Sequence, residues 1–596
     1  MLFDSTILAR VAADVRHTAI GARVQRVFAP DKTAIALDLR RKLPRPQVVL
    51  SWSAEFGRVH MCGDAEPKPD LNLSIADVLR KHLRGATLVD CRQIAFDRLV
   101  HLQFANCAGL GPDSRATLIA EIMGRHANLV LVDETNTILG CAKHVTIEVN
   151  RYRETFPGIE YTPPPTFHRL PPGEATAESI AQAASGQPDK ALRGFVRGTL
   201  TGASDIFLDE VAARAHLDGD ALLDDLPAGW QANLVRAAHD ILDEAETAGA
   251  PGLLYADTDA TAQADFAYPL VLQSNADLDT RLTTDISQAL EELVHLKHVG
   301  RLIRERKDRL MGFAQRALKK SQGRERERRR ALDQAEKAEV LRRTGELILA
   351  NLHAIPPGAE QVQVVDYYEP EQPEVTLQLD ANYSAKQNAK ALFDRYKRAK
   401  RIQQRVPRLL RQARIQREYV QGILQQIQAA ENLDELDQLE HELARAGHIG
   451  AQAARRRRPP AVGNVEPRRT VSADGYPVVF GRTGIQNDAI IRMANSEDVW
   501  LHVKNGPGGH VLIRTDGRPD EVPQSTIMQA AALAAFLSHW RSDARADVNY
   551  TAAKHLRKPK GAPPGFVTYT EFSTVTVEPA DLTGEPPRVA DDEPIH

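Results

Sequence analysis

The sequence predicts a multidomain α+β protein in which two α+β domains are separated by helical segments, the longest of which form an arm. Three observations predict this fold class. The chain has 596 residues, more than one ordinary core holds. Short strand-like runs fill both ends of the chain, whereas apolar positions three and four residues apart mark long helices in its middle. The 42% hydrophobic and 26% charged fractions are those of a globular protein.

Residues 1–170 are predicted to form the first α+β domain. Strand-like runs such as IALDLR and NLVLVD alternate there with helical pieces such as SIADVLRKHL. The proline-rich stretch TPPPTFHRLPPGE then ends the domain. Residues 175–262 follow as an acidic, alanine-rich helical domain, and the segment RGTLTGASDIFLDEVAARAHLD within it is compatible with a helix-hairpin-helix.

Residues 279–447 are predicted to form a long antiparallel coiled-coil arm with a small insert near residues 353–384. Apolar positions from Ile402 to Ala430 alternate in steps of four and three, and Gln416 is the only polar interruption. Pro407, early in this seam, should kink or restart the helix. The insert, VVDYYEPEQPEVTLQLD, is broken by proline and too short for a full domain.

Charge is distributed unevenly, although the net charge is only −3. Residues 203–260 carry 13 acidic and two basic side chains, a net charge of −11. Residues 301–343 have a net charge of +9 and residues 386–417 of +11, and an RRRR run follows at residues 455–458. Basic segments of this kind bind polyanions, of which nucleic acid is the commonest in a cytoplasm. A solvated helix surface is the alternative for each run taken alone.

Motifs of a self-contained catalyst are missing from the sequence. It contains no GxxxxGK[ST] phosphate loop, no GxGxxG opening a helix, no HExxH and no GxSxG. Cys62, Cys91, Cys107 and Cys141 have no CxxC spacing, which argues against a structural zinc site or a disulfide framework. We therefore expect no catalytic residue, no cofactor and no metal. Without a signal pattern or a run of about 18 apolar residues, we expect a cytoplasmic protein with no membrane partner.

Residues 498–514, DVWLHVKNGPGGHVLIR, are predicted to form a β-hairpin centred on Gly506. Partners then have residue numbers that sum to 1012, which places Val499 and Leu501 on a core face. The other face would be open and would suit stacking on bases and holding phosphates. The residues of this predicted RNA-binding face are Trp500, His502, Lys504, His510 and Arg514.

Other interpretations of this hairpin are a purely structural one and a metal or acid–base site. Asp498 would lie roughly 13 Å from His502 along the extended strand, too far for a shared metal ion. Downstream, Lys558 and Lys560 in the loop KHLRKPKGAPPG are candidate contacts to an RNA backbone, with a solvated loop as the alternative.

A second candidate cluster lies in the N-terminal domain. Asp97 and Arg98 stand where a strand begins in AFDRLVHLQF, and Glu121, Arg125 and Asn128 stand just before another strand in EIMGRHANLVLVD. An adjacent Asp–Arg pair is usually a local salt bridge or a cap, so the residues alone do not decide for a functional site.

These motifs stand in an order that resembles the NFACT family in its bacterial form. The N-terminal domain has LRKHL, FDR and EIMGRHANLVL, and the arm has DYYEP and NAKALFDRYKRAKR. The C-terminal domain has GRTGIQND, DVWLHVKNGPGGHV, AALAAF and KPKGAPPG. The resemblance covers about residues 1–580. It implies a glycosylase-like fold for the N-terminal NFACT-N domain and an RNA-binding NFACT-R domain at residues 465–580, after which residues 581–596 are expected to be disordered.

The resemblance implies a role in ribosome-associated quality control. Members of the family bind the large (50S) ribosomal subunit and its rRNA while it still holds a peptidyl-tRNA nascent chain. They bring charged tRNA, in bacteria tRNA-Ala, so that the stalled chain receives an untemplated tail that marks it for degradation. The subunit's own RNA would make the peptide bonds, so we do not expect an enzyme. The resemblance assigns tRNA binding to Asp97 and Arg98, and a tRNA-side surface to Glu121, Arg125 and Asn128.

The sequence departs from the family pattern at Gly509, where a serine usually precedes the second histidine, so a hydroxyl contact is lost there or not needed. The chain starts Met1-Leu2-Phe3 instead of with a nucleophilic proline and lacks zinc-finger cysteines, so glycosylase chemistry is not expected. Two alternatives remain. One is a fibronectin-binding surface adhesin, which would need an export signal. The other is a nuclease or glycosylase that uses the histidine face.

Overall fold

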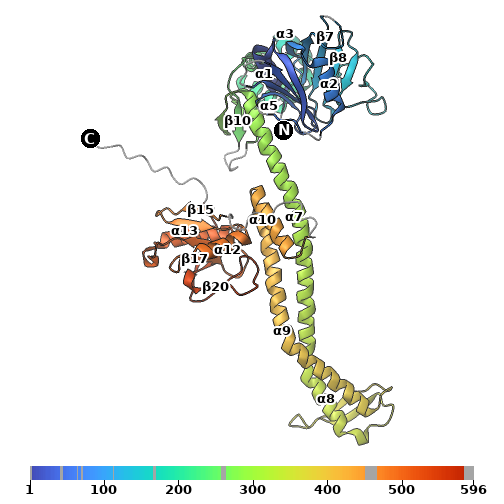
Figure 1. Cartoon of the computed structure of the whole chain (residues 1–596), viewed down its shortest axis with the longest axis vertical. Helices are drawn as coiled ribbons and strands as arrows, with labels where there is room; N and C mark the ends of the chain where they lie inside the picture. The colour runs from blue at the N-terminus through green and yellow to red at the C-terminus, as the bar shows by residue number, and fades with distance from the viewer. Residues whose placement is uncertain are drawn as a thin grey trace, which may run out of the picture. The chain divides into compact units, whose positions relative to one another are not determined.

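A computed structural model of the chain describes residues 3–40, 45–63, 65–68, 71–111, 113–165, 169–256, 264–449 and 466–582. The chain divides into two compact units, Met1–Gly300 and Arg301–His596. Helices and strands occur in both units (Figure 1), which confirms the multidomain α+β class. The basic run at residues 455–458 and the expected tail beyond residue 582 lie outside the described residues.

The first unit is built on a nine-stranded antiparallel sheet in the order β4-β3-β2-β1-β5-β6-β7-β8-β9. Helices α1 (Ser5–Ala19) and α2 (Ser74–Leu83) pack against this sheet, and their apolar faces join its main core cluster. Asp4 starts α1 by accepting a hydrogen bond from the Ile7 backbone at 3.0 Å, as an N-cap residue does. The strands are β1 (Arg23–Asp31), β2 (Ala34–Arg40), β3 (Gln47–Ser51), β4 (Arg58–Cys62), β5 (Thr87–Gln93), β6 (Leu99–Ala105), β7 (Arg115–Glu121), β8 (Asn128–Asp133) and β9 (Ile138–Cys141).

Four short helices follow in the acidic region: α3 (Ala177–Ala184), α4 (Leu192–Thr199), α5 (Asp205–Arg214) and α6 (Trp230–Ala245). Helices α4 and α5 are joined by a turn that contains Gly202, as the helix-hairpin-helix pattern predicted. Two predicted boundaries are wrong: the helical domain does not extend to residue 262, and the arm does not begin at residue 279. A three-stranded sheet of β10 (Leu253–Ala256), β11 (Phe266–Tyr268) and β12 (Asp279–Leu282) occupies these positions, and the long helix begins only at Ile286.

The arm is formed by α7 (Ile286–Ala335), α8 (Ala338–Ala350), α9 (Ala385–Ala429) and α10 (Leu433–Arg445). Within the second unit α7 and α9 run antiparallel, side by side (Figure 1). Lys307 donates to the Gln428 carbonyl, Arg328 to that of Leu409, and Gln403 to that of Ala335. The insert is a two-stranded sheet, β13 (Gln361–Val365) with β14 (Glu374–Gln378). Whether the helices supercoil as a coiled coil stays a prediction.

The heptad seam of α9 faces inward. Ala413, Val420, Ile423 and Ile427 are all buried, and the last two pack with α7 and α10 in one apolar cluster. Helix α9 continues through Pro407, so the expected restart there is wrong. Proline forfeits one backbone hydrogen bond within a helix, and packing along the rest of a 45-residue helix outweighs that local cost.

The C-terminal part of the second unit is a six-stranded antiparallel sheet in the order β15-β16-β18-β17-β19-β22. Helix α13 (Gln524–Phe536) packs on one face of this sheet. Helix α12 (Gly484–Met493) and the small sheet β20 (Leu556–Arg557) with β21 (Thr568–Tyr569) pack on the other. The strands are β15 (Arg468–Val471), β16 (Pro477–Phe480), β17 (Val499–Val503), β18 (Val511–Ile513), β19 (Ala546–Ala552) and β22 (Ser573–Val577).

The hairpin of β17 and β18 has the predicted register. Val499 pairs with Ile513, Trp500 with Leu512 and Leu501 with Val511, so the partner numbers sum to 1012. Nowhere in the described part of the chain is a helix both long and apolar enough to cross a membrane.

Candidate nucleic-acid interface

A cavity of about 560 Å³ in the first unit brings the two predicted N-terminal motifs together. We call it the N-terminal cavity. Asp97 and Arg98 line it beside Gly124 and His126, which belong to the second motif. Strand pairing explains this meeting, because Leu99 of β6 lies opposite Glu121 of β7. The other lining residues are Phe3, Asp4, Ser53, Ala54, Glu55, Gly57, Ile122, Met123, Pro164, Pro165, Arg169, Thr201, Gly202, Ala203 and Ser204.

The turn before β6 holds Asp97 in place. Ala95 and Phe96 both have positive φ angles, of 51° and 50°, which few non-glycine residues adopt. Gln93 donates from its side chain to the Asp97 carbonyl at 2.9 Å. The Asp97 carboxylate accepts from the Arg98 backbone N–H at 2.7 Å, so the pair is joined through the main chain. Arg98 is exposed at the cavity and is placed to meet an anion.

Gly202 ties the helix-hairpin-helix turn to the same cavity. Its φ angle is +67°, and a Cβ atom built on it would lie 1.9 Å from the Phe96 carbonyl oxygen. Only glycine permits this approach. The close contact therefore couples the α4–α5 turn to the turn that carries Asp97.

Two of the predicted tRNA-side residues are buried structural groups, so the prediction of a surface role for them is wrong. Glu121 is 0% exposed. Its two oxygens accept from the Arg153 guanidinium at 2.6 Å each, and one also accepts from the Tyr161 hydroxyl at 2.8 Å. Asn128 is buried as well and joins its own strand to the backbone of Lys143 through two hydrogen bonds.

Arg125, by contrast, is exposed, and its Nε donates to His126 Nε2 at 3.0 Å. Its role in tRNA binding stays a prediction. Sequence reasoning missed His126 and Arg169, although His126 lies inside the EIMGRHANLVL motif and so carried a signal. Arg169 lies within the proline-rich stretch TPPPTFHRLPPGE, where no motif indicated a functional role for it.

A second cavity, of about 530 Å³, lies in the second unit between α9 and the β17–β18 hairpin. We call it the C-terminal cavity. Its lining corrects the expectation of an open hairpin face, because Trp500 and His510 are each 1% exposed and His502 is half-buried. The predicted face is instead covered by α12, by the segment of β20 and β21 and by α9. The rings of His502 and His510 do meet, at a centroid distance of 5.3 Å.

Three of the predicted basic contacts are engaged with carboxylates. Arg514 pairs with the buried Asp498 at 3.1 Å, and Lys504 with Asp547 at 3.6 Å. Lys558 pairs with Asp488. Lys560 is exposed in the same loop. An RNA-binding role for the four cations stays a prediction, and the structure adds a structural role for Arg514.

Two imidazoles of the C-terminal cavity, those of His502 and His510, are neutral. Burial lowers the pKa of His502 to about 4, and it lowers the pKa of His510 well below its ordinary value, with His502 and Lys558 adding to that effect. Each neutral ring has one N–H donor and one acceptor nitrogen. These two histidines thus make the cavity polar without adding positive charge.

Gly509 lies against the Gly481 carbonyl oxygen, where a Cβ atom would come within 2.4 Å. The hydroxyl expected at this position in the family has no room in this backbone. Asn487, which no sequence motif indicated, fixes the turn by accepting from the His510 backbone N–H at 3.0 Å and donating to the Gly508 carbonyl.

Buried polar contacts join α10 to the C-terminal sheet domain within the second unit. Glu442 accepts from the Ile485 backbone N–H at 2.9 Å and from the Tyr419 hydroxyl at 3.1 Å. Arg482 pairs with Glu431 at 2.5 Å. We call this group the docking contact; it holds α9 as one wall of the C-terminal cavity.

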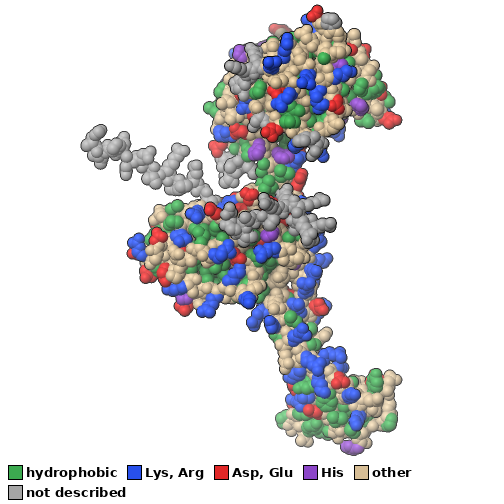
Figure 2. All heavy atoms as spheres, in the orientation of Figure 1, with side chains coloured by type: hydrophobic (Ala, Val, Ile, Leu, Met, Phe, Trp, Pro, Cys, Tyr) green, Lys and Arg blue, Asp and Glu red, His purple; other side chains and the backbone are tan. Residues whose placement is uncertain are grey.

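Helix α9 also carries a row of unpaired cations, which we call the basic stripe. Lys397, Arg401, Arg405 and Arg408 are exposed, and their spacing of four, four and three places them on one helix face. None of them pairs with a carboxylate of the described residues. Figure 2 shows Lys and Arg side chains gathered along the arm. A row of unneutralised cations on a rigid helix suits the phosphate backbone of nucleic acid.

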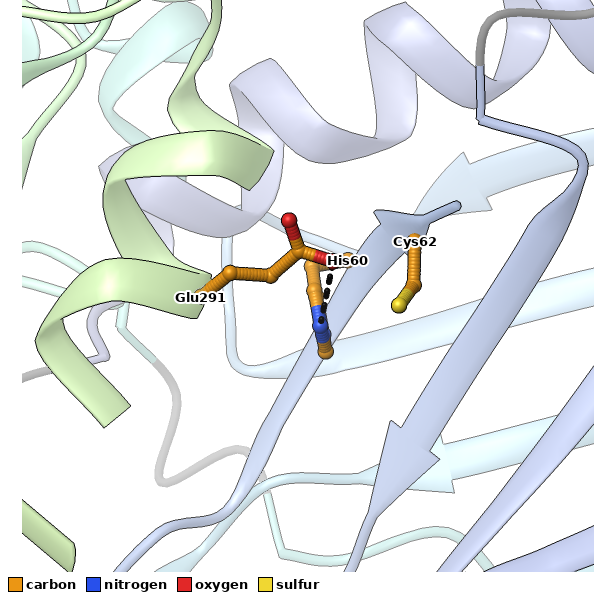
Figure 3. Close-up of side chains that lie close together, drawn as sticks. All are labelled: His60, Cys62 and Glu291. Carbon is orange, nitrogen blue, oxygen red and sulfur yellow. Dashed lines mark ion pairs between the residues drawn. The ribbon is translucent and has the colours of Figure 1, made fainter. Parts of the chain in front are cut away.

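One group among the described residues has donor atoms close enough together to hold a metal ion, and the expectation that the protein binds no metal stays a prediction. The donor atoms of His60, Cys62 and Glu291 lie within 4.8 Å of one another (Figure 3). Two arginines oppose a cation there. Arg45 pairs with Glu291, and the pKa of His60 is lowered by burial first and then by Arg58 and Arg45. These charges favour a buried contact between β4 and α7.

The two cavities and the basic stripe are features of a multidomain nucleic-acid-binding protein. The family described as NFACT N-terminal and middle domains matches residues 4–461, and the NFACT protein RNA binding domain matches residues 467–570. The chain belongs to the NFACT family, as its motifs predicted.

Relatives match over very different lengths. The Bacillus subtilis (strain 168) protein named Rqc2 homolog RqcH is 28% identical over 581 residues, 97% of this chain and 98% of the relative. The human protein named ribosome quality control complex subunit NEMF is 30% identical over 161 residues, 26% of this chain and 14% of that protein.

Among solved structures, the N-terminal part of a fibronectin/fibrinogen-binding protein from Streptococcus suis has 25% sequence identity and a TM-score of 0.41. The match covers 49% of this chain and 99% of that one. A score this low supports no argument, so the glycosylase-like fold of the N-terminal domain stays a prediction.

Proposed function

We propose that this protein is a ribosome quality-control factor. It binds a large ribosomal subunit that is obstructed by peptidyl-tRNA, and it recruits charged tRNA, alanyl-tRNA in particular, for untemplated C-terminal tailing of the stalled chain. The observation that carries the proposal is the match over 97% of the chain to a protein named Rqc2 homolog RqcH.

The geometry supports RNA as the partner at three places. The N-terminal cavity presents Arg98 and Asp97 beside the exposed His126, a set that can hold a phosphate and accept from ribose or base donors. The basic stripe offers four unpaired cations to an RNA backbone. The wall of the C-terminal cavity that carries the β17–β18 hairpin belongs to the segment that matches an RNA-binding domain.

The proposed mechanism is positioning without covalent catalysis. The ribosomal subunit's RNA forms each peptide bond, and this protein raises the rate by holding the incoming tRNA where reaction follows. Asp97 and Arg98 hold the tRNA, and the arm holds the ribosomal subunit through the antiparallel helices α7 and α9, which we take to form a coiled coil.

The test is a stalling reporter in cells that carry Asp97→Ala with Arg98→Ala. Mass spectrometry of the reporter is expected to show alanine tails with the unaltered protein and to lose them with the double variant. Asp90→Ala with Arg92→Ala is the matched control, since this Asp–Arg pair (2.8 Å) lies on β5 and does not line the cavity. Tails that persist in the double variant would refute the site, and tails absent with unaltered protein would refute the function.

The adhesin alternative gains no support, because the solved structure that bears such a name matches only with the low TM-score given above.

A further inference from the structure

Four polar atoms around the C-terminal cavity have neither a hydrogen-bond partner nor an ion-pair partner among the residues that the structure describes. They are Trp500 Nε1, His510 Nδ1, His539 Nδ1 and the Gln426 side-chain oxygen. Arg417 Nε, which also lines the cavity without a hydrogen bond, is held in an ion pair with Glu325 at 2.8 Å. Trp500 and His510 are each only 1% exposed. An unpaired buried polar group is destabilising, so such groups are rare unless a ligand or water meets them.

These atoms come from both walls of the cavity. Trp500 and His510 lie on or beside the β17–β18 hairpin, and His539 follows α13. Gln426 belongs to α9, together with Ile415, Tyr419 and Gly422 of the same wall. The docking contact fixes the two walls against each other. A volume of about 530 Å³ is that of a small-molecule pocket.

The residues that line the cavity indicate which chemical group of RNA it would bind. Arg417, the cation of the lining, is already paired with Glu325 at 2.8 Å and with Glu418 at 3.1 Å, and burial lowers the pKa of both His502 and His510, so the cavity offers a phosphate little positive charge. Neutral imidazoles, an indole N–H and an amide oxygen offer mixed donors and acceptors, which is the pattern of a nucleobase edge. Tyr569, whose ring centroid lies 5.1 Å from that of Trp500, and Phe566 add aromatic walls for a flat ligand.

We propose that the C-terminal cavity binds one unpaired nucleobase of an RNA strand, read at its edge by Trp500, His510, His539 and Gln426. The inference rests on the proposed function, because it takes RNA as the partner. Its new content is that the contacted RNA is single-stranded at this point, since base pairing hides the edge that the cavity would read. It also makes α9 part of the recognition surface.

The test compares RNA chains that differ only in their bases. Full-length protein is titrated with short single-stranded oligoribonucleotides of A, C, G or U, and with a chain of equal length made of abasic ribose phosphates. At least one base is expected to bind about tenfold more tightly than the abasic chain, which retains only the phosphate contacts.

Two variants assign this preference to the cavity. Ile415→Trp fills the cavity from α9, and Trp500→Phe removes the indole N–H while keeping a smaller aromatic ring. Both variants are expected to reduce the base preference without weakening the binding of the abasic chain. Gln412→Trp adds the same bulk at an exposed position of α9 outside the lining and should change nothing. Circular dichroism checks that each variant is folded.

Equal binding of all five chains, or a base preference unchanged in both variants, would overturn the inference. These results are separable from failure of the proposed function. If the protein isolated from cells carries neither tRNA nor large-subunit rRNA, the function fails whatever the base preference. If it carries them and no base preference exists, only the cavity assignment fails.

Discussion

Glu442 makes the docking contact sensitive to pH. Its side chain is 1% exposed and lies between the Ile485 backbone N–H and the Tyr419 hydroxyl. Burial raises the pKa of Glu442 to about 7, from 4.5, and the charge of Asp488 adds to the shift. Hydrogen bonds from Ile485 and Tyr419 act in the opposite direction without cancelling it.

The direction in which stability changes with pH follows from proton binding. Since the folded protein binds this proton more tightly than the unfolded chain, the stabilisation is complete below pH 4.5 and is lost as pH rises through about 7. A shift of this size corresponds to about 3 kcal/mol at 1.36 kcal/mol per pKa unit. Glutamine has the shape of the protonated acid, so Glu442→Gln is expected to remove this pH dependence.

Urea unfolding between pH 5 and pH 8 measures the effect. Trp52 and Trp230 are replaced by phenylalanine, which leaves Trp500 and Trp540 of the second unit as the fluorescent reporters among four tryptophans. We expect the free energy of unfolding of the Glu442→Gln protein, relative to the unaltered one, to rise by about 2.5 kcal/mol from pH 5 to pH 8. The lowered pKa values of His502 and His510 act in the opposite sense in both proteins and cancel in the difference. Parallel pH profiles for the two proteins would refute a protonated, buried Glu442.

Three further predictions concern the RNA surface and the N-terminal cavity. Replacing Arg401 and Arg405 by Gln should weaken RNA binding and lower the slope of log affinity against log salt by about 1.4–1.8. Replacing the ion-paired Arg342 and Arg343 should change that slope little, and equal changes would contradict the basic stripe. Glu121→Ala should cost about 3–5 kcal/mol in thermal unfolding, because it leaves Arg153 buried without its partner, and an unchanged melting temperature would contradict the structural role. Gly202→Ala should cost about 1–3 kcal/mol and weaken tRNA binding, because its Cβ meets the Phe96 carbonyl. Gly186 has a similar φ angle of +80° with open space around it, so Gly186→Ala should leave tRNA binding intact. A loss of tRNA binding in both variants would make the effect of Gly202→Ala non-specific.

The hairpin shows what local pattern determines and what it does not. Alternation around the turn was enough to predict the register of Val499, Trp500 and Leu501, because pairing depends on residues within one short segment. The burial of Trp500 and His510 depends on α12, on Tyr569 and on α9, which lie far away in the sequence. The imidazoles led to the prediction of an open face, but neutral histidines are also compatible with a buried face.

The same limit explains the errors in the N-terminal domain. Glu121 and Asn128 stood in a motif beside exposed residues, but their partners Arg153, Tyr161 and Lys143 come later in the chain. The strand β12 at Asp279–Leu282 is exposed along its whole length and has no alternating pattern to reveal it. Strand β6 was predicted from its pattern, but β7, which pairs with it and brings Gly124 beside the Asp97 turn, was not.

RNA that accompanies the protein in cells decides whether it is a ribosome quality-control factor that recruits tRNA. The full chain and its Asp97→Ala, Arg98→Ala variant are isolated under native conditions, and the RNA in each is sequenced. We expect large-subunit rRNA with both proteins, together with one enriched tRNA species that the variant loses. RNA without enrichment of either kind, or a tRNA fraction that the variant keeps in full, would contradict this role.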